Sequence, residues 1–307
     1  MQRLIAIVDD GTDALAAPHP LDRGSATEAM QPARPLERGG LSADVVDRPR
    51  EVRRPRRAGV IGVPVSATTY AEAVDCILEA ARRRRPYTVT ALAVHGVVEA
   101  SRDPGFRRVI EDFDMVTPDG QPVRFALNLL HRAGLRDRVY GPTLMLRLCE
   151  RAARDGVGIY LYGSTLDTVT RLERELVAGF PGLVVAGSEP SIFRPLTAGE
   201  SVALAQRIER SGAGLVFVGL GCPRQERFAH DHRDLIGVPQ VTVGAAFDFH
   251  ARTKKQAPGW VQAASLEWLY RLCQEPRRLF RRYLVTNSLF VWRFALQAIA
   301  LGLKGRA

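Results

Sequence analysis

The sequence predicts an α/β fold in which helices cover both faces of a parallel sheet. Four apolar runs of strand length alternate with amphipathic helical stretches: IYLYG (159–163), LVVAG (183–187), LVFVG (215–219) and VTVGAAF (241–247). Strands that are apolar on both sides are typical of a parallel sheet buried between helices. Strand, helix and strand in repeated order imply right-handed crossovers within one sheet. We therefore assign a Rossmann-like fold, in which ligands bind at the carboxyl ends of the strands.

The first half of the domain shows the same alternation less regularly. Residues 60–65 are an expected strand, and Thr69-x-x-Glu72 is a capping box that opens a helix to about Arg83. The β-branched run 87–94 is a second strand. The further expected elements are a helix over 96–110, a short strand over 115–118, and helices over 122–133, 142–154, 166–178, 198–210 and 224–232.

Composition divides the chain into three parts. Its 307 residues, 46% of them hydrophobic and 25% charged, suit a globular protein with a sizeable core. Residues 1–57 are rich in Pro, Arg, Asp, Gly and Ala, so we expect a disordered N-terminal extension. Residues 58–257 form the α/β domain. Residues 258–307 break the alternation and are expected to form a basic helical appendage, with one helix over 258–273 and another from Pro276.

The net charge of +10 is concentrated at the end of the chain. Residues 1–57 carry a net charge of +1, residues 58–251 are neutral, and residues 252–307 carry +9. Such an end is expected to meet an anion, either a membrane surface, a nucleic acid or a phosphorylated substrate, and the neutral body counts against nucleic acid. The apolar stretch 289–303 contains an arginine and a glutamine, which suits a helix lying in an anionic bilayer interface. A helix docked on the protein's own core is an equal alternative.

Several features predict a cytoplasmic protein. The four cysteines stand far apart, which argues against a disulfide framework and against a zinc cluster. The apolar part of the N-terminus is too short for a secretory signal, and no run of 18 uninterrupted apolar residues predicts a transmembrane helix. The sequence leaves open whether the chain forms a homo-oligomer.

The first candidate ligand site follows the strand 215–219. It is the run Gly219-Leu220-Gly221-Cys222-Pro223-Arg224-Gln225-Glu226. Glycines permit close backbone approach, and the free N–H groups of the helix that follows favour an anion such as a diphosphate. The run lacks the third glycine of the dinucleotide fingerprint. A plain tight turn is the alternative, and the Arg-Gln-Glu triplet favours a ligand site.

Carboxylates and a histidine provide further candidates. Asp119, in Thr117-Pro118-Asp119-Gly120, is placed at the sheet rim to take a proton from an acceptor hydroxyl, and a turn aspartate is the alternative. Asp112-Phe113-Asp114 has an Asp-x-Asp pattern but precedes the strand, so we expect a solvated helix end and no metal site. His95 ends the strand 87–94 and is placed to hydrogen-bond a sugar or phosphate.

Arginines of the appendage form the last candidate site. Arg271, Arg278 and Arg281 would share one face of a continuous helix, and Pro276 leaves that continuity open. Three converging guanidiniums can grip a pyrophosphate through bidentate hydrogen bonds. The alternative is a stripe that faces lipid, and one segment can serve both purposes.

Seven short segments are spread over roughly residues 60–285. Any one of them is a weak signal, but the set in this order is highly specific. They are TPDG (117–120), RVYG (138–141), IYLYGS (159–164), GLGCPRQE (219–226), VGAAFD (243–248), KKQAPGW (254–260) and LEWLYRLCQEPRRLFRRY (266–283). Together they resemble the WecG/TagA/CpsF family of bacterial glycosyltransferases. The resemblance implies inverting transfer of a sugar from a UDP-sugar to a polyprenyl-diphosphate-linked saccharide at the cytoplasmic face of the membrane, with neither a metal nor another cofactor.

The resemblance also implies roles for individual residues. Asp119 resembles the proposed catalytic base, Arg138 the arginine proposed to steady the departing diphosphate, and Gln225 the glutamine near the sugar. The three appendage arginines resemble those that close over the site and help to seat the enzyme on the membrane. The remaining residues expected to bind substrate are Thr90, His95, Gly163, Ser164, Gly219, Gly221, Pro223, Glu226 and Asp248.

Two motifs depart from the family pattern. Many members carry Thr-x-Asn at the end of an early strand, where this chain has residues 90–96, TALAVHG. This form resembles an exopolysaccharide branch that includes glucosyltransferases, so glucose joins N-acetylmannosamine as an expected donor sugar. A Gly-x-Asp-Leu motif is changed to Gly141-Pro142-Thr143-Leu144.

Two other classes of function stand beside this leading hypothesis. One is a Rossmann-type enzyme that uses NAD or S-adenosylmethionine, which the missing third glycine disfavours for NAD. The other is a non-catalytic protein that binds a membrane surface through its basic end.

Overall fold

A computed structural model describes residues 52–263 and 266–304 of the chain. The predicted extension lies outside the described residues as far as residue 51. Residues 52–57 run along the domain, where the Tyr87 hydroxyl donates to the carbonyl of Arg53 at 2.9 Å and Arg54 forms an ion pair with Asp114 at 2.6 Å.

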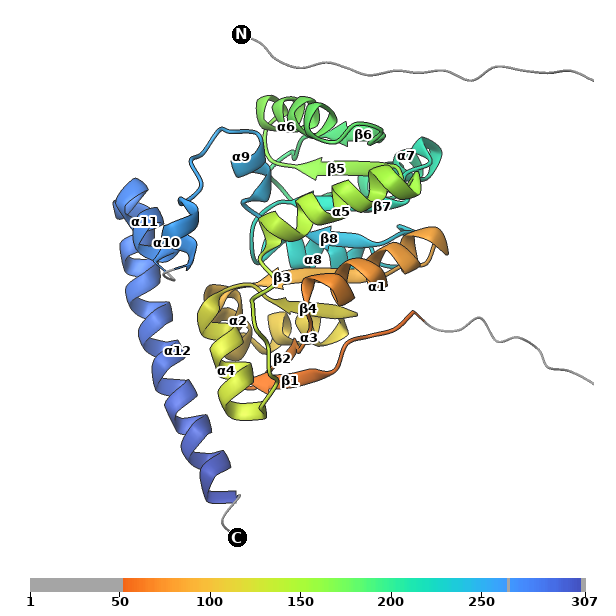
Figure 1. The fold of residues 1–307 in the computed structure, drawn as a ribbon. Helices are drawn as coiled ribbons and strands as arrows, with labels where there is room; N and C mark the ends of the chain where they lie inside the picture. Colours follow the sequence, from red (N-terminus) through yellow and green to blue (C-terminus); the bar gives the residue numbers. More distant parts are fainter. Residues whose placement is uncertain (1–51, 264–265, 305–307) are drawn as a thin grey trace, which may run out of the picture. The chain divides into compact units, whose positions relative to one another are not determined.

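Among these residues a six-stranded sheet forms the centre of the domain, with every neighbouring pair of strands parallel. The strand order is β4-β3-β8-β7-β5-β6. The strands are β3 (Thr88–Leu92), β4 (Met115–Pro118), β5 (Ile159–Gly163), β6 (Val185–Glu189), β7 (Leu215–Gly219) and β8 (Gln240–Thr242). The α/β class predicted from the sequence is confirmed (Figure 1).

Helices connect these strands in the predicted alternation. They are α1 (Tyr70–Arg82), α2 (Val94–Arg102), α3 (Pro104–Asp112), α4 (Gln121–His131), α5 (Gly141–Asp155), α6 (Leu166–Gly179), α7 (Ala198–Ser211), α8 (Arg224–Asp231) and α9 (Ala246–His250). Thr69 caps α1, because its hydroxyl accepts from the N–H of Glu72 at 3.3 Å.

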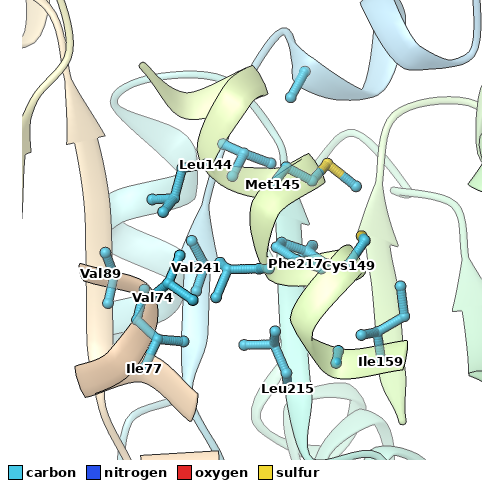
Figure 2. Packing of buried hydrophobic residues seen from close by; sticks show 14 of the residues in the cluster. Val74, Ile77, Val89, Leu144, Met145, Cys149, Ile159, Leu215, Phe217 and Val241 are labelled. Atoms are coloured by element: carbon cyan, nitrogen blue, oxygen red, sulfur yellow. The ribbon is translucent and has the colours of Figure 1, made fainter. Parts of the chain in front are cut away.

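Alternate residues of the strands enter cores on opposite faces of the sheet. Ile159 and Leu161 of β5 join the cluster that includes α1, α5, α6 and α9, whereas Tyr160 and Tyr162 join the cluster that includes α7 and α8. Figure 2 shows the first cluster, in which side chains of α1 and α5 lie against the strands. The period of two explains why these strands are apolar throughout.

The stretch predicted as one strand over residues 60–65 is an antiparallel hairpin instead. β1 (Arg57–Val60) pairs with β2 (Val63–Ser66) across a turn at Ile61 and Gly62, whose φ angles are +46° and +83°. A tight hairpin turn of this kind requires positive φ at both central residues. Isoleucine is uncommon there, so the apolar pattern concealed the turn.

The helix predicted over residues 96–110 is likewise two helices, α2 and α3. Oδ1 of Asp103 accepts from the backbone N–H groups of Gly105 and Phe106 at 2.8 and 3.1 Å, and Pro104 is the first residue of α3. An aspartate cap followed by proline is a strong helix start, so it ends the preceding helix.

Over residues 258–263 and 266–304, the appendage contains three helices: α10 (Gly259–Ala263), α11 (Glu267–Gln274) and α12 (Pro276–Lys304). The predicted first helix is thus divided, and Pro276 begins a new helix. The continuous helix that would align the three appendage arginines is therefore not formed, because Arg271 lies in α11. The side chains of Arg278 and Arg281 lie outside the described part of the structure.

The polar residues within the apolar stretch of α12 dock this helix on the domain. Arg293 donates to the carbonyl and hydroxyl of Ser101 at 2.9 and 2.7 Å. The Gln297 side chain donates to the carbonyl of Gly59 at 2.8 Å and accepts from the N–H of Ile61 at 2.6 Å. Phe290 is buried in the core that includes α2 and α3, and Figure 1 shows α12 beside α2 and α4.

The other side of α12 is apolar and exposed. By length and composition alone, Tyr283–Gly302 could cross a membrane. Only 11% of its most apolar stretch is buried within the protein, so most of this stretch is exposed. The large apolar side chains that this helix exposes include Phe280, Leu284, Val291, Trp292, Leu296 and Ile299. The helix therefore docks on the domain through Phe290 and two hydrogen-bonding side chains, and exposes its other large apolar groups.

The Asp-x-Asp pair is not the solvated helix end that the sequence predicts, because Asp114 is buried. Its side chain is 2% exposed; Oδ2 accepts from the N–H and hydroxyl of Thr88, and Oδ1 pairs with Arg54 and with Arg233. Asp112 is exposed and contacts His230. Asp114 therefore joins the start of β3 to two other segments of the chain.

Substitution of Asp114 by alanine should lower the free energy of unfolding by about 3 kcal/mol, because it leaves Arg233 and the Thr88 N–H without their partner. Denaturant unfolding measures this loss. Asp112→Ala is the matched control and should change stability by less than about 0.5 kcal/mol. Equal effects of the two substitutions would show that Asp114 does not brace the fold.

Candidate active site

Asp119 lies directly after β4, at the carboxyl edge of the sheet. Its carboxyl is partly buried and accepts a hydrogen bond from the N–H of Gly141 at the start of α5. Burial raises the pKa of Asp119 to about 7; Arg138 opposes this shift, and the charge of Glu267 adds to it. The carboxyl therefore exchanges its proton close to neutral pH.

Arg138 and Glu267 form a buried ion pair beside Asp119. Their side chains are 9% and 13% exposed, and the Arg138 guanidinium also lies 4.3 Å from the centre of the Tyr140 ring. Oε1 of Glu267 is buried and has no hydrogen-bond partner among the described residues. Because Glu267 lies in α11, the appendage completes the charge balance around Asp119.

A first cavity, of about 570 Å³, lies along the strand ends and is called here the strand-end cavity. The loops after β5, β7 and β8 line it, and three cationic side chains reach it: Arg224, Lys254 and Arg271. Lys254 pairs with Asp248 at 2.9 Å. This cavity can therefore receive a phosphorylated ligand at several loops at once.

A second cavity, of about 410 Å³, lies between the domain and the appendage and is called here the appendage cavity. Arg138 and Glu267 line one part of it, while Leu279, Phe290 and Val291 of α12 contribute apolar surface. The two cavities share five lining residues, which are Ala93, His95, Asp119, Tyr140 and Arg271. Asp119 therefore stands where the two cavities meet.

The structure brings many of the predicted site residues to the strand-end cavity. Those that line it are His95, Asp119, Ser164, Gly219, Gly221, Gln225, Asp248 and Arg271. Arg138 lines the appendage cavity instead, on the other side of Asp119. Thr90, Gly163, Pro223 and Glu226 line neither cavity.

Thr90, Gln225 and Glu226 form a buried network beneath the loop after β7. Oε1 of Glu226 accepts from the Thr90 hydroxyl at 3.0 Å and from Nε2 of Gln225 at 2.9 Å. Oε1 of Gln225 accepts from the N–H of Gly221 at 3.1 Å, so this backbone donor is already engaged. Burial raises the pKa of Glu226 above its ordinary value. These hydrogen bonds fix the shape of the loop after β7.

Two of the predicted glycines are required by packing rather than by a ligand. A side chain at Gly163, whose φ is +132°, would place Cβ 2.6 Å from the carbonyl oxygen of Gly219. A side chain at Gly219 would place Cβ 2.6 Å from the Phe247 ring. Gly221, with a φ of +76° and open space around it, allows the loop to turn beside the cavity.

Sequence reasoning did not identify Glu267, Lys254 or Tyr140 as site residues, and it included Arg224 only as part of the glycine-rich run. Glu267 and Lys254 lie in the matched segments 266–283 and 254–260, and Arg224 lies in the glycine-rich run. Their segments were therefore recognised, but which of their side chains reach the cavities depends on the folded chain. Among residues 52–263 and 266–304, no cluster of three or more His, Cys, Asp or Glu side chains is arranged to hold a metal ion.

A titratable carboxyl between a basic cavity and an apolar one, at the carboxyl edge of a parallel α/β sheet, is an arrangement typical of an enzyme active site. The sequence model of the glycosyl transferase WecG/TagA/CpsF family matches residues 58–303. The chain therefore belongs to this family and is a hexosyltransferase.

Two curated relatives share much of the chain. An N-acetylglucosaminyldiphosphoundecaprenol N-acetyl-beta-D-mannosaminyltransferase of Bacillus spizizenii is 31% identical over 189 residues, which is 61% of this chain and 70% of that protein. A protein of the same name from Bacillus subtilis is 29% identical over 180 residues, which is 58% of this chain and 68% of that protein.

We expect Glu267→Gln to lower the pKa of Asp119. The substitution removes a neighbouring negative charge and releases Arg138 to stabilise the Asp119 carboxylate. The titration midpoint of the ¹³C-labelled Asp119 carboxyl, followed by NMR, should fall from about 7 by roughly one unit. Glu200→Gln, at the start of α7, is the control and should leave the midpoint in place. A midpoint that did not move in the Glu267 variant would exclude this coupling.

Proposed function

We propose that the protein transfers a hexose from a UDP-sugar to a saccharide on polyprenyl diphosphate, with inversion at the anomeric carbon. The observation that carries this proposal is the position of Asp119 at the junction of the strand-end cavity and the appendage cavity. An inverting transfer needs one base, placed between donor and acceptor, that removes the proton of the acceptor hydroxyl.

The donor fits the strand-end cavity. Arg224, Lys254 and Arg271 offer charge-assisted hydrogen bonds to a diphosphate, and the turn at Gly221 allows a ligand to approach the backbone closely. The family resemblance supports a UDP-sugar, with glucose or N-acetylmannosamine as the sugar. The sugar then points along the cavity toward Asp119.

The acceptor fits the appendage cavity, whose two kinds of surface match an amphipathic molecule. The names of both relatives describe an acceptor that joins a sugar to undecaprenol through diphosphate. Apolar residues of α12 suit the lipid, and Arg138 suits a phosphate near the sugar. This position gives Arg138 contact with the acceptor side, in addition to the role at the departing diphosphate that the resemblance implies.

The reaction follows from these positions. Ionised Asp119 takes the proton of the acceptor hydroxyl while the hydroxyl oxygen attacks the anomeric carbon from the side opposite the diphosphate. The bond between the anomeric carbon and the phosphate oxygen breaks, and UDP carries away the electron pair. Arg271 and Lys254 stabilise the charge that develops on UDP, so cationic side chains take the place of a divalent metal.

The membrane is the proposed setting of this reaction. The exposed apolar side of α12 and the net charge of +9 over residues 252–307 suit peripheral binding to an anionic bilayer. We place the enzyme at the cytoplasmic face of the cell membrane, in the assembly of an exopolysaccharide or another cell-surface polysaccharide. No nucleic acid partner is proposed.

Asp119→Asn should reduce UDP release by about 10²–10⁴-fold, because asparagine cannot take the proton of the acceptor. The assay supplies UDP-glucose or UDP-N-acetylmannosamine with a polyprenyl-diphosphate saccharide, in the presence of EDTA. Wild-type turnover should survive the chelator, and Asp112→Asn should match wild type. Undiminished turnover of the Asp119 variant would refute its role as the base, and loss of wild-type turnover in EDTA would refute metal independence.

Glutamates on the outer side of α12 should release the protein from membranes. Trp292 and Ile299 are 63% and 60% exposed, so a Trp292→Glu, Ile299→Glu variant should fold normally but bind anionic vesicles at least about tenfold less tightly. Vesicle co-sedimentation measures this change. Val202→Glu, on α7, is the matched control, since Val202 is also an exposed apolar residue. Equal binding by all three proteins would contradict anchoring through α12.

A further inference from the structure

A further cavity adjoins the strand-end cavity and has no role in the reaction described above. It has a volume of about 410 Å³ and lies beyond the ends of β5 and β7, between α8 and the loop that joins β6 to α7. We call it the side cavity. Its lining shares Ser164, Phe193, Gly219, Leu220 and Arg224 with the strand-end cavity. A ligand in the strand-end cavity can therefore extend into it.

Stacked aromatic rings contribute to the wall of the side cavity. The ring centres of Tyr162 and Phe228 are 4.8 Å apart, and those of Phe228 and His232 are 4.0 Å apart, with interplanar angles of 25° and 22°. Leu196 and Leu220 add apolar surface. A cavity with such walls suits a flat, partly apolar ring.

Phe193 stands at the border between the side cavity and the strand-end cavity. Its side chain is 59% exposed, and its φ of +57° is uncommon for a bulky residue. The hydroxyl of Ser191 accepts from its N–H at 3.0 Å and holds the backbone in place. Strained conformations of this kind gather at ligand-binding positions. The exposed ring is therefore available to cover the face of a ligand.

His232 supplies the side cavity with a hydrogen-bond acceptor. Its Nδ1 lies 2.8 Å from the carbonyl oxygen of Phe228, which can only accept, so Nδ1 carries the proton. Its Nε2 then offers a lone pair, and this buried atom has no hydrogen-bond partner among the described residues. Burial also lowers the pKa of His232, which keeps the ring neutral. A buried acceptor of this kind favours a ligand that presents an N–H group.

We propose that the side cavity binds the base of the donor nucleotide and that Nε2 of His232 accepts the N3–H of uracil. Uracil presents one N–H between two carbonyl groups, whereas cytosine presents a lone pair at the same position. Phe193 covers the face of the base, and Arg224, which lines both cavities, contacts the phosphates. This proposal rests on the UDP-sugar proposed above and adds the residue that selects uracil.

Binding of nucleoside diphosphates to the full-length protein tests the proposal. Isothermal titration calorimetry with UDP, CDP, ADP and GDP should show that wild type binds UDP about tenfold more tightly than CDP. His232→Phe keeps a ring in the stack but removes the acceptor, so the ratio of UDP to CDP affinity should fall to about one. His232→Gln keeps an acceptor oxygen and should retain a preference for UDP.

Two further variants distinguish recognition of the nucleotide base from general effects on folding. Phe193→Ala changes an exposed side chain, so it should fold normally while weakening UDP and CDP binding by a similar factor. His230→Phe, two residues from His232 in the sequence, is the matched control and should bind as wild type does, because His230 does not line the side cavity and Asp112, one of its two partners, does not line it either.

The outcomes distinguish this proposal from the donor assignment beneath it. If wild type prefers UDP and neither Phe193→Ala nor His232→Phe changes its binding, the side cavity does not hold the base, while the UDP donor stands. If wild type binds ADP or GDP more tightly than UDP, or binds none of the four, the UDP-sugar donor is wrong and the base assignment is overturned with it.

Discussion

The site depends on one charge arrangement, in which Asp119 stands beside a guanidinium that a second carboxylate already engages. Arg138 and Glu267 are both largely buried, and each acts on the pKa of Asp119. Burial is the largest cause of the raised pKa of Asp119, which is about 7; Arg138 opposes this shift, and the charge of Glu267 adds to it. Glu267, which lies far along the chain from Asp119, thus adds to the basicity that burial gives this carboxylate.

This arrangement links the proposed base to the docking of the appendage. Glu267 reaches Arg138 only when α11 is docked on the domain, and α12, which follows, is held to the domain by Arg293 and Gln297. The same helix exposes its apolar side. In the proposed setting, the surface that meets the lipid and the carboxylate that tunes the base belong to one continuous segment. Membrane binding and completion of the site are therefore physically connected.

The sequence predicted the α/β class, the order of its elements and the motif loops at the strand ends, because buried parallel strands leave long apolar runs. It did not predict the turn at Ile61, because the apolar pattern concealed it, or the burial of Asp114, because that depends on contacts distant in sequence. Spacing also cannot separate glycines that serve packing from those that serve a ligand, as Gly163 and Gly221 illustrate. The pairing of Arg138 with Glu267 likewise could not be predicted from the sequence, because it brings together residues that are far apart along the chain.

The pH dependence of kcat/KM tests the central claim most directly, because it reports the ionisation of the essential base in the free enzyme. With Asp119 as a base whose pKa is near 7, kcat/KM should fall about tenfold for each pH unit below an acid midpoint near 7, because the ionised fraction is then inversely proportional to proton concentration. A rate that stays constant down to about pH 5 would contradict the account, because the base would then have the pKa of an ordinary exposed carboxylate.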